Sequence, residues 1–459
     1  MTTEKNGSAK SIQKEMEKYL GIHSIEELYQ DIPSSLLLSQ PLDVPGPFSE
    51  RDLTQHLDKI LSKNRTVVSF LGGGIANHYI PALVREVMTK PELLNSYTPY
   101  QPEVSQGMLQ GLFEYQSLFC ELTNMNVINA SMYDWATAIG EAILMAVRLA
   151  KRRTKVLISK AISPDRLAVV KNYLAGPEID YELVGYDPTT GEVNLAALQE
   201  KLSENIAGFY FENPNYFGVI ESQAEEICKL VHQVQARAIV GVDPLSLALI
   251  KPPGDYQADI VVGEGQPFGS AMSFGGPILG FIGMNYDRKN IRHMPGRLVG
   301  LTTTEDEQQR AFTLTLSTRE QHIRREKATS NICTNQSILG FAAGVYLSLL
   351  GPEGLKGTAE YCLSAARYLA MKINELTHFE APALSGTHFK EFTIRLTQGK
   401  MKDVENMLIE RGFIGGFSLV KSHPELGEAT VVCVTEMHSM EDIDNFLSAL
   451  EEIDKELGG

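Results

Sequence analysis

The sequence lacks lysine over a long central stretch, and it is poor in cysteine. Residues 252 to 288 contain no lysine at all. The five cysteines lie far apart and none forms a C-x-x-C pair. This spacing excludes zinc, iron–sulfur and disulfide-stapled classes of protein. We therefore expect no metal site and a reducing, cytoplasmic setting.

Other missing features exclude further functional classes. No apolar run opens the sequence, so we expect no secretory signal. The longest apolar stretch, residues 338 to 350, is too short to cross a bilayer and is predicted to be a buried helix. A net charge of −16 argues against a broad basic face for nucleic acid. No G-x-G-x-x-G follows the first strand, which disfavours a Rossmann NAD enzyme. We expect neither a membrane nor nucleic acid among the partners.

Short apolar, β-branched runs alternate with longer helical patterns between residues 66 and 335. Each run is continuous, which is typical of strands buried on both faces of a parallel sheet. The runs lie at residues 127–130, 155–159, 206–211, 238–243, 259–262 and 278–282. We predict an α/β fold whose large domain, residues 66–335, holds a doubly wound, mostly parallel sheet. A helical N-terminal arm of residues 1–65 precedes it, and a smaller α+β domain of residues 336–459 follows it.

The lysine gap falls where one class of cofactor enzyme needs a lysine. The run at residues 238–242 ends in Asp243, and the run at residues 259–262 leads into a Gly-rich turn that contains Gln266. Enzymes that hold pyridoxal phosphate on such a sheet use an acid at the first position and a Schiff-base lysine after the second strand. The frame is present without the covalent anchor. The sequence therefore predicts a subunit that cannot run this chemistry alone, with Asp243 a vestigial cofactor residue that serves as a cap or structural acceptor.

Two loops combine a restricted backbone with polar side chains. Residues 71–79 hold three consecutive glycines followed by Asn77 and His78. This is either a tight turn or a site loop with both side chains pointing inward. Residues 97–107 hold two prolines, and we interpret them as a site-lining loop, with a plain interface loop as the alternative. The candidate side chains of that loop are Tyr97, Tyr100, Glu103 and Gln106.

Two further segments carry charged residues, one in the turn before a predicted helix and one in a basic stretch. The turn before the helix at residues 137–151 contains Asp134 and Trp135. A phosphate would be repelled there, so we expect a capped and filled turn. The basic stretch at residues 324–327, with Arg324, Arg325 and Lys327, is a solvated face, an anion site or a subunit contact, and the sequence does not choose among them.

Five segments together resemble one protein family closely. They are residues 97–107, 263–267, 273–277, 294–300 and 324–334. They are similar to subunit 1 (alpha) of the two-subunit P-proteins of the glycine cleavage system, glycine dehydrogenase (aminomethyl-transferring). The resemblance implies the aspartate aminotransferase fold, fold type I. It also implies a subunit 2 (beta) that carries the pyridoxal phosphate lysine, in an α2β2 assembly.

The reaction that the resemblance implies is glycine decarboxylation, with transfer of the aminomethyl group to the lipoyl arm of the H-protein. We expect the polar candidates of the two loops to line a shared pocket or a lipoyl tunnel. Two rival hypotheses stay open at this point. The chain is a non-catalytic structural or regulatory partner, or it is a self-sufficient pyridoxal phosphate enzyme that uses a lysine elsewhere, such as Lys251 or Lys289.

Overall fold

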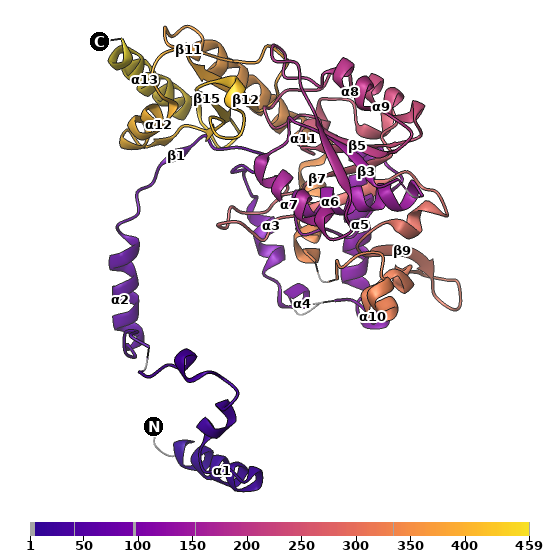
Figure 1. Cartoon of the computed structure of the whole chain (residues 1–459), viewed down its shortest axis with the longest axis vertical. Coiled ribbons are helices and arrows are strands. Elements are labelled where there is room, and N and C mark those ends of the chain that lie inside the picture. The colour runs from indigo at the N-terminus through magenta and orange to yellow at the C-terminus, as the bar shows by residue number, and fades with distance from the viewer. Residues whose placement is uncertain (1–4, 41, 95–97, 152, 334, 459) are drawn as a thin grey trace. The chain divides into compact units, whose positions relative to one another are not determined.

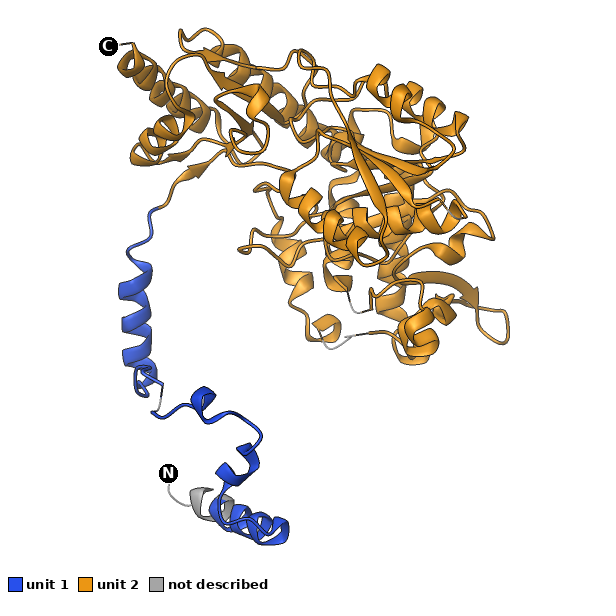
Figure 2. Ribbon diagram, in the orientation of Figure 1, with its two compact units in different colours: residues 1–65 blue, residues 66–459 orange. Residues whose placement is uncertain are grey.

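The chain forms two compact units, residues Met1–Arg65 and Thr66–Gly459 (Figure 2). A computed structural model describes residues 5–40, 42–94, 98–151, 153–333 and 335–458. Over residues 5–40 and 42–65, the first unit contains four helical segments: α1 (Lys5–Leu20), η1 (Ile25–Tyr29), η2 (Ser34–Leu36) and α2 (Glu50–Leu61).

Helices in the first unit begin at two serines, where side chains satisfy free backbone N–H groups. The backbone N–H of Asp52 donates to Ser49 Oγ at 3.2 Å, which caps α2. Ser24 and Glu27 form a capping box at the start of η1. The segment after Ser24 is a short 3-10 helix, whereas α2 is a regular α-helix.

A central sheet organises the second unit (Figure 1). Within the described residues it has seven strands in the order β2-β8-β7-β6-β5-β3-β4. Neighbours are parallel except that β8 runs antiparallel to both β7 and β2. The predicted mostly parallel sheet is therefore confirmed. Its strands are β2 (Val127–Ile128), β3 (Lys155–Ser159), β4 (Asp180–Val184), β5 (Ile206–Glu212), β6 (Arg237–Val242), β7 (Ile260–Glu264) and β8 (Gly280–Met284).

Helices cover both faces of this sheet. Side chains on both faces of its strands are therefore buried, and the strand sequences are unbroken apolar runs. In β5, Phe209 and Phe211 lie in one core cluster and Tyr210 lies in the other, as the two-residue period of a strand requires. Helices α5 (Gln106–Thr123), α9 (Ala224–Gln233) and α11 (Ser337–Ile373) contribute to the first cluster, and α6 (Trp135–Leu149) and α7 (Pro164–Ala175) to the second. The doubly wound architecture is confirmed.

A second, antiparallel sheet lies in the C-terminal part of the chain. Its strand order is β11-β12-β15-β14. Phe70 belongs to the core beneath it, and the short strand β1 (Val68–Ser69) pairs in parallel with β13 (Phe413–Ile414). The segment just after residue 65 therefore packs with the C-terminal domain, while the boundary at residues 335 and 336 stays a prediction. The elements are β11 (Phe379–Glu380), β12 (Glu391–Leu396), α12 (Met401–Glu410), β14 (Phe417–Ser418), β15 (Ala429–Cys433) and α13 (Met440–Leu457).

Helix α11 runs from the first core cluster of the central sheet into the core of the C-terminal domain. Gly351 (φ 61°) interrupts it just before Pro352, at the place where the sequence predicted a helix to end. Among the described residues it is the one helix long and apolar enough to cross a bilayer by composition alone, a test that core helices also pass. Leu339 lies in the first core cluster and Leu369 in the C-terminal core, which accounts for its apolar composition.

Shorter elements complete the second unit and carry the loops between the main ones. They are α3 (Ala82–Met88), α4 (Pro91–Leu94), η3 (Pro102–Val104), α8 (Leu195–Lys201), η4 (Ser246–Ala248), η5 (Pro253–Tyr256), η6 (Asn290–His293), β9 (Leu298–Thr303), β10 (Arg310–Thr315), η7 (Ser317–Arg319), α10 (Gln321–Arg324), η8 (Arg325–Lys327) and η9 (Pro424–Leu426). Strands β9 and β10 form an antiparallel hairpin.

Gly218, in the turn after β5, packs against the backbone of the C-terminal domain. Its φ is +81°, and a Cβ there would overlap the carbonyl oxygen of Glu391. We predict that Gly218→Ala lowers the free energy of unfolding by about 3 kcal/mol, from backbone strain and the clash. Gly357→Ala is the matched control, because a Cβ there meets no atom within 4 Å. Alanine also favours a helix over glycine by about 1 kcal/mol. Urea denaturation measures both, and equal midpoints for the two variants would contradict the prediction.

Candidate functional site

The fold places a site at the carboxyl ends of the parallel strands, near β5, β6 and the start of α6. A cavity of only about 10 Å³ remains there, room for about one water molecule. Its lining includes Trp135, Arg166, Pro214, Asp243 and Lys390. The place where a cofactor would lie is therefore filled by the chain itself.

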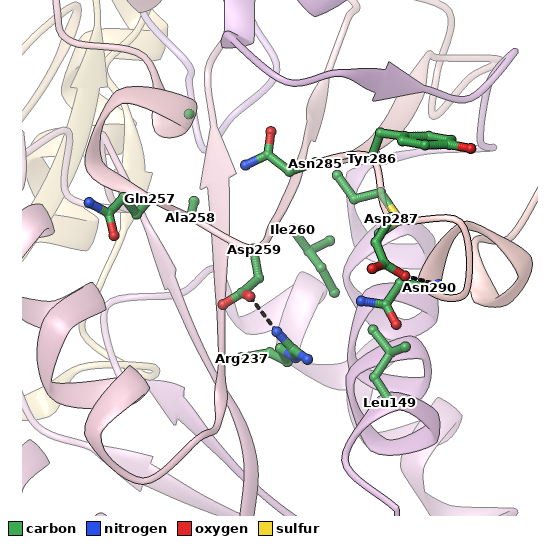
Figure 3. A pocket seen from close by; sticks show the side chains of 12 residues that line it. Leu149, Arg237, Gln257, Ala258, Asp259, Ile260, Asn285, Tyr286, Asp287 and Asn290 are labelled. Atoms are coloured by element: carbon green, nitrogen blue, oxygen red, sulfur yellow. Dashed lines mark hydrogen bonds and ion pairs between the residues drawn. The ribbon is translucent and has the colours of Figure 1, made fainter.

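A larger cavity, of about 260 Å³, lies at the opposite ends of the strands (Figure 3). Arg237 and Asp259, at the starts of β6 and β7, form an ion pair of 2.8 Å beside it. Sheets of this kind bind ligands at the other end of their strands. Size alone therefore does not make this cavity the functional site.

A buried chain of polar side chains runs through the filled site. Lys390, which is 2% exposed and precedes β12, places its Nζ 2.8 Å from Asp243 Oδ2. The same Nζ lies 2.9 Å from His78 Nε2. On its far side, His78 Nδ1 lies 2.9 Å from Glu436 Oε2. These contacts join the large sheet, the Gly-rich loop and the C-terminal domain.

The hydrogen-bond pattern fixes the proton positions along this series of polar side chains. An ammonium group can only donate, so Lys390 donates to both Asp243 and His78 Nε2. The proton of the imidazole is then on Nδ1, which donates to the Glu436 carboxylate. The backbone N–H of Tyr79 donates to the same carboxylate at 2.8 Å. Each charged group in this series of side chains is therefore paired.

The electrostatics agree with this assignment. Burial and the charge of Lys390 lower the pKa of His78, which keeps the ring neutral. Burial alone would lower the pKa of Lys390, but the negative charges nearby, chiefly Asp243, outweigh it and raise that pKa. Burial opposes ionisation of Glu436, yet the His78 hydrogen bond and the Tyr79 N–H lower its pKa to about 2.

Trp135 and Arg166 fill the rest of the space. The Arg166 guanidinium lies 4.2 Å from the centre of the Trp135 ring and forms two bonds to Glu212, of 2.9 and 2.8 Å. This two-pronged geometry is the strongest that arginine makes with a carboxylate. The Asp134 side chain accepts from the N–H of Thr137 at 2.7 Å and caps α6. The capped and filled turn expected from the sequence is confirmed.

Two of the three consecutive glycines bind a carboxylate of this chain. The backbone N–H groups of Gly73 and Gly74 donate to Glu391 Oε1 at 2.5 and 3.2 Å. Gly74 has a φ of +98°, and a Cβ there would overlap the Arg166 guanidinium. Glycine is required at this position for both reasons.

Gln266 stands in the slot where a Schiff-base lysine would be expected, and it is 1% exposed. Its side-chain nitrogen donates to the Ser270 carbonyl at 2.9 Å, and its side-chain oxygen accepts from Ala76 N–H at 3.4 Å. Glu264 nearby accepts from the N–H groups of Leu279, Gln266 and Trp135 at 2.8, 3.1 and 3.2 Å. The slot therefore carries a network of structural hydrogen bonds.

The structure separates the side chains proposed from the sequence. His78 is buried and Asn77, beside it, is exposed, so only one of the two points inward. Glu103 is exposed and Tyr100 is 46% exposed. Gln106 forms two bonds with the backbone of Phe312, both of 2.9 Å, and holds β10. Tyr97 lies outside the described residues. The pocket-lining role of these residues stays a prediction.

Tyr100 lies beside a buried arginine. The Arg297 guanidinium, 3% exposed, donates to Tyr100 Oη at 3.0 Å and lies 5.1 Å from the ring centre. The His322 ring meets the Tyr100 ring edge-on at 5.4 Å. The basic stretch at residues 324–327 is exposed. Its role stays a prediction.

Sequence reasoning located the Gly-rich loop, Trp135 and Asp243, but it missed three charged residues that line the site, Arg166, Lys390 and Glu391. The strand end at residues 212–218 resembles one that faces a cofactor ring, although such a turn motif is weak on its own. Lys390 and Glu391 open an alternating strand, where charged side chains usually face solvent. No local pattern predicted that these two would be buried.

Burial raises the pKa of Glu264 to about 8, against the backbone hydrogen bonds that lower it. The folded protein therefore binds this proton more tightly than the unfolded chain. The contribution of Glu264 to stability is then largest below pH 4.5 and is lost as the pH rises to about 8. We predict that Glu264→Gln removes this loss, which amounts to at most about 1.4 kcal/mol per pH unit.

The measurement is the free energy of unfolding from pH 5 to pH 9. Glu204→Gln, at an exposed position, should follow the wild type throughout. A Glu264→Gln curve parallel to the wild type would contradict the prediction.

Comparisons with known proteins agree on one family. The family model of the glycine cleavage system P-protein matches residues 5–450. Relatives named probable glycine dehydrogenase (decarboxylating) subunit 1 include one from Staphylothermus marinus, 42% identical over 98% of both chains. Another, from Pyrococcus horikoshii, is 44% identical over 96% of this chain and 97% of its own.

Solved structures give the same result. A crystal structure of glycine decarboxylase (P-protein) of the glycine cleavage system, in inhibitor-bound form, has a TM-score of 0.83 and 35% identity, over 96% of this chain and 97% of its own. A sphingosine-1-phosphate lyase from Burkholderia pseudomallei, at 14% identity and a TM-score of 0.65 over 92% of this chain and 93% of its own, shares the fold. These likenesses confirm the predicted fold type I of pyridoxal phosphate-dependent transferases. The chain belongs to the glycine cleavage system P-protein family.

Proposed function

We propose that this chain is subunit 1 (alpha) of a two-subunit glycine decarboxylase of the glycine cleavage system, working in the cytoplasm. Its relatives of nearly equal length carry the name subunit 1. In the proposed α2β2 assembly, subunit 2 holds pyridoxal phosphate on its lysine and this chain forms part of the pocket wall. The substrates are glycine and the lipoyl arm of the H-protein.

The observation that carries this proposal is the filled site. The side chains present do not fit pyridoxal phosphate, because a cavity of about 10 Å³ cannot take a phosphorylated pyridine ring. Asp243, which would face the ring nitrogen, is already paired with Lys390. A glutamine stands where the Schiff-base lysine would be. This chain therefore carries out no catalytic step on a cofactor of its own.

The self-sufficient enzyme is disfavoured by the positions of its two candidate lysines. Lys251 is 54% exposed and lies 3.5 Å from Glu225. Lys289 is also exposed. Neither is among the side chains that line the filled site. The structural-partner hypothesis remains as the alternative, and the exposed loop with Tyr100 and Glu103 separates it from our proposal.

We predict that the purified chain alone shows no aldimine absorbance and no glycine/CO2 exchange, whereas a mixture with subunit 2 shows both. The physical reason is that the lysine and the cofactor space belong to the partner. Borohydride reduction followed by peptide mass spectrometry should place the cofactor on subunit 2. Exchange activity in this chain by itself would contradict the proposed division of labour.

We predict that Glu103→Ala, in the assembled complex, lowers glycine/CO2 exchange by about tenfold to a hundredfold. A polar wall group that orients the substrate has effects of this size. The exposed Glu204→Ala is the matched control and should leave exchange unchanged. Size-exclusion chromatography checks assembly. Normal exchange in a correctly assembled Glu103 variant would favour the structural-partner alternative.

A further inference from the structure

Asp243 has a binding partner that the fold alone does not explain. It follows β6 and faces the filled site, where the frame of a pyridoxal phosphate enzyme presents an acid to the ring nitrogen. Its partner here is Lys390 Nζ, at 2.8 Å. A protonated pyridine nitrogen and an ammonium group both donate a hydrogen bond to a carboxylate and both carry one positive charge. The two cations are therefore chemically interchangeable in front of this acid.

The surroundings hold Lys390 in place. Its side chain is 97% buried, and its second hydrogen bond goes to His78 Nε2 at 2.9 Å. The neutral His78 ring in turn donates to Glu436. Phe389 and Glu391, its neighbours in sequence, line the same small cavity. Little space remains into which the ammonium group could withdraw.

We propose that Lys390 is a built-in substitute for the cofactor ring, a cation supplied by the chain that permanently occupies the ring-nitrogen position in front of Asp243. This inference rests on the proposed function in one respect, the reading of that position as the place of the ring. The cofactor position thereby has a specific internal occupant, and Asp243 has a cationic partner in a subunit that lacks the lysine anchor.

The substitution has a structural consequence within this chain. Lys390 comes from the C-terminal domain, Asp243 from the central sheet and His78 from the Gly-rich loop. The ammonium group therefore links all three parts through its contacts with Asp243 and His78. A partner removed from such a pair leaves an unpaired buried charge, which is strongly destabilising. The folded state of this subunit depends on Lys390 and needs no cofactor.

Chemical rescue tests the proposal on the full chain. Lys390→Ala should lower the thermal midpoint by about 5 °C or more. Propylammonium, which matches the deleted atoms in size and charge, should restore a large part of that loss in a saturable manner. Propan-1-ol, equal in size and neutral, should not, and neither compound should shift the wild type. Equal rescue by both, or rescue by neither in a folded variant, would overturn the proposal.

A second pair of variants covers the case in which Lys390→Ala does not fold. Lys390→Met keeps all but the last heavy atom of the side-chain length and removes the charge, so it should also lower the thermal midpoint. Lys390→Met combined with Asp243→Asn should regain most of the loss, because no unpaired charge remains. A single Lys390→Met variant as stable as the wild type, or a double variant no better than the single, would overturn the proposal.

These readouts are independent of the partner subunit and of glycine. They measure unfolding of this chain alone, whereas the proposed function is tested by exchange in the complex. An adduct of pyridoxal phosphate on Lys390 after borohydride reduction of the wild-type chain would show that the lysine is an anchor, and would overturn the substitution. If the wild-type chain mixed with subunit 2 shows no glycine/CO2 exchange, while propylammonium still rescues Lys390→Ala, only the proposed function is refuted.

Discussion

A single buried cation constrains the second unit of this chain. Lys390 lies between Asp243 and His78, at 2.8 and 2.9 Å, and a buried charge of this kind is tolerated only when its hydrogen bonds are satisfied. The strand end of β6, the Gly-rich loop and the start of β12 must therefore meet at one point. The small cavity and the tight packing of the C-terminal domain follow from that requirement.

Two further carboxylates reinforce the same junction. Glu391 accepts hydrogen bonds from the Gly73 and Gly74 backbone, and Glu212 holds the Arg166 guanidinium that stacks on Trp135. Each pairs an anion with donors from a different part of the chain. The interior of this subunit is built to be closed, whereas the loop with Tyr100 and Glu103 stays exposed. This division suits a subunit that contributes a surface to a pocket held by its partner.

The features that the sequence predicted are local ones. The apolar runs located the buried strands, Asp243 ended one of them, and Asp134 capped α6, because each signal lies within a few residues of its consequence. The features that it missed depend on distance along the chain. His78 and Lys390 are 312 residues apart, and a lysine opening an alternating strand gives no sign of burial. Tertiary packing alone decided that it points inward.

The filling of the site has a consequence for any attempt to install a cofactor on this chain. Replacing Gln266 with lysine would place an amine in the slot, yet Trp135, Arg166 and Lys390 would still occupy the room that a cofactor needs. Each of these three side chains is paired or stacked, so replacing any of them would also cost stability. A single substitution is therefore not enough to turn this fold into a pyridoxal phosphate enzyme.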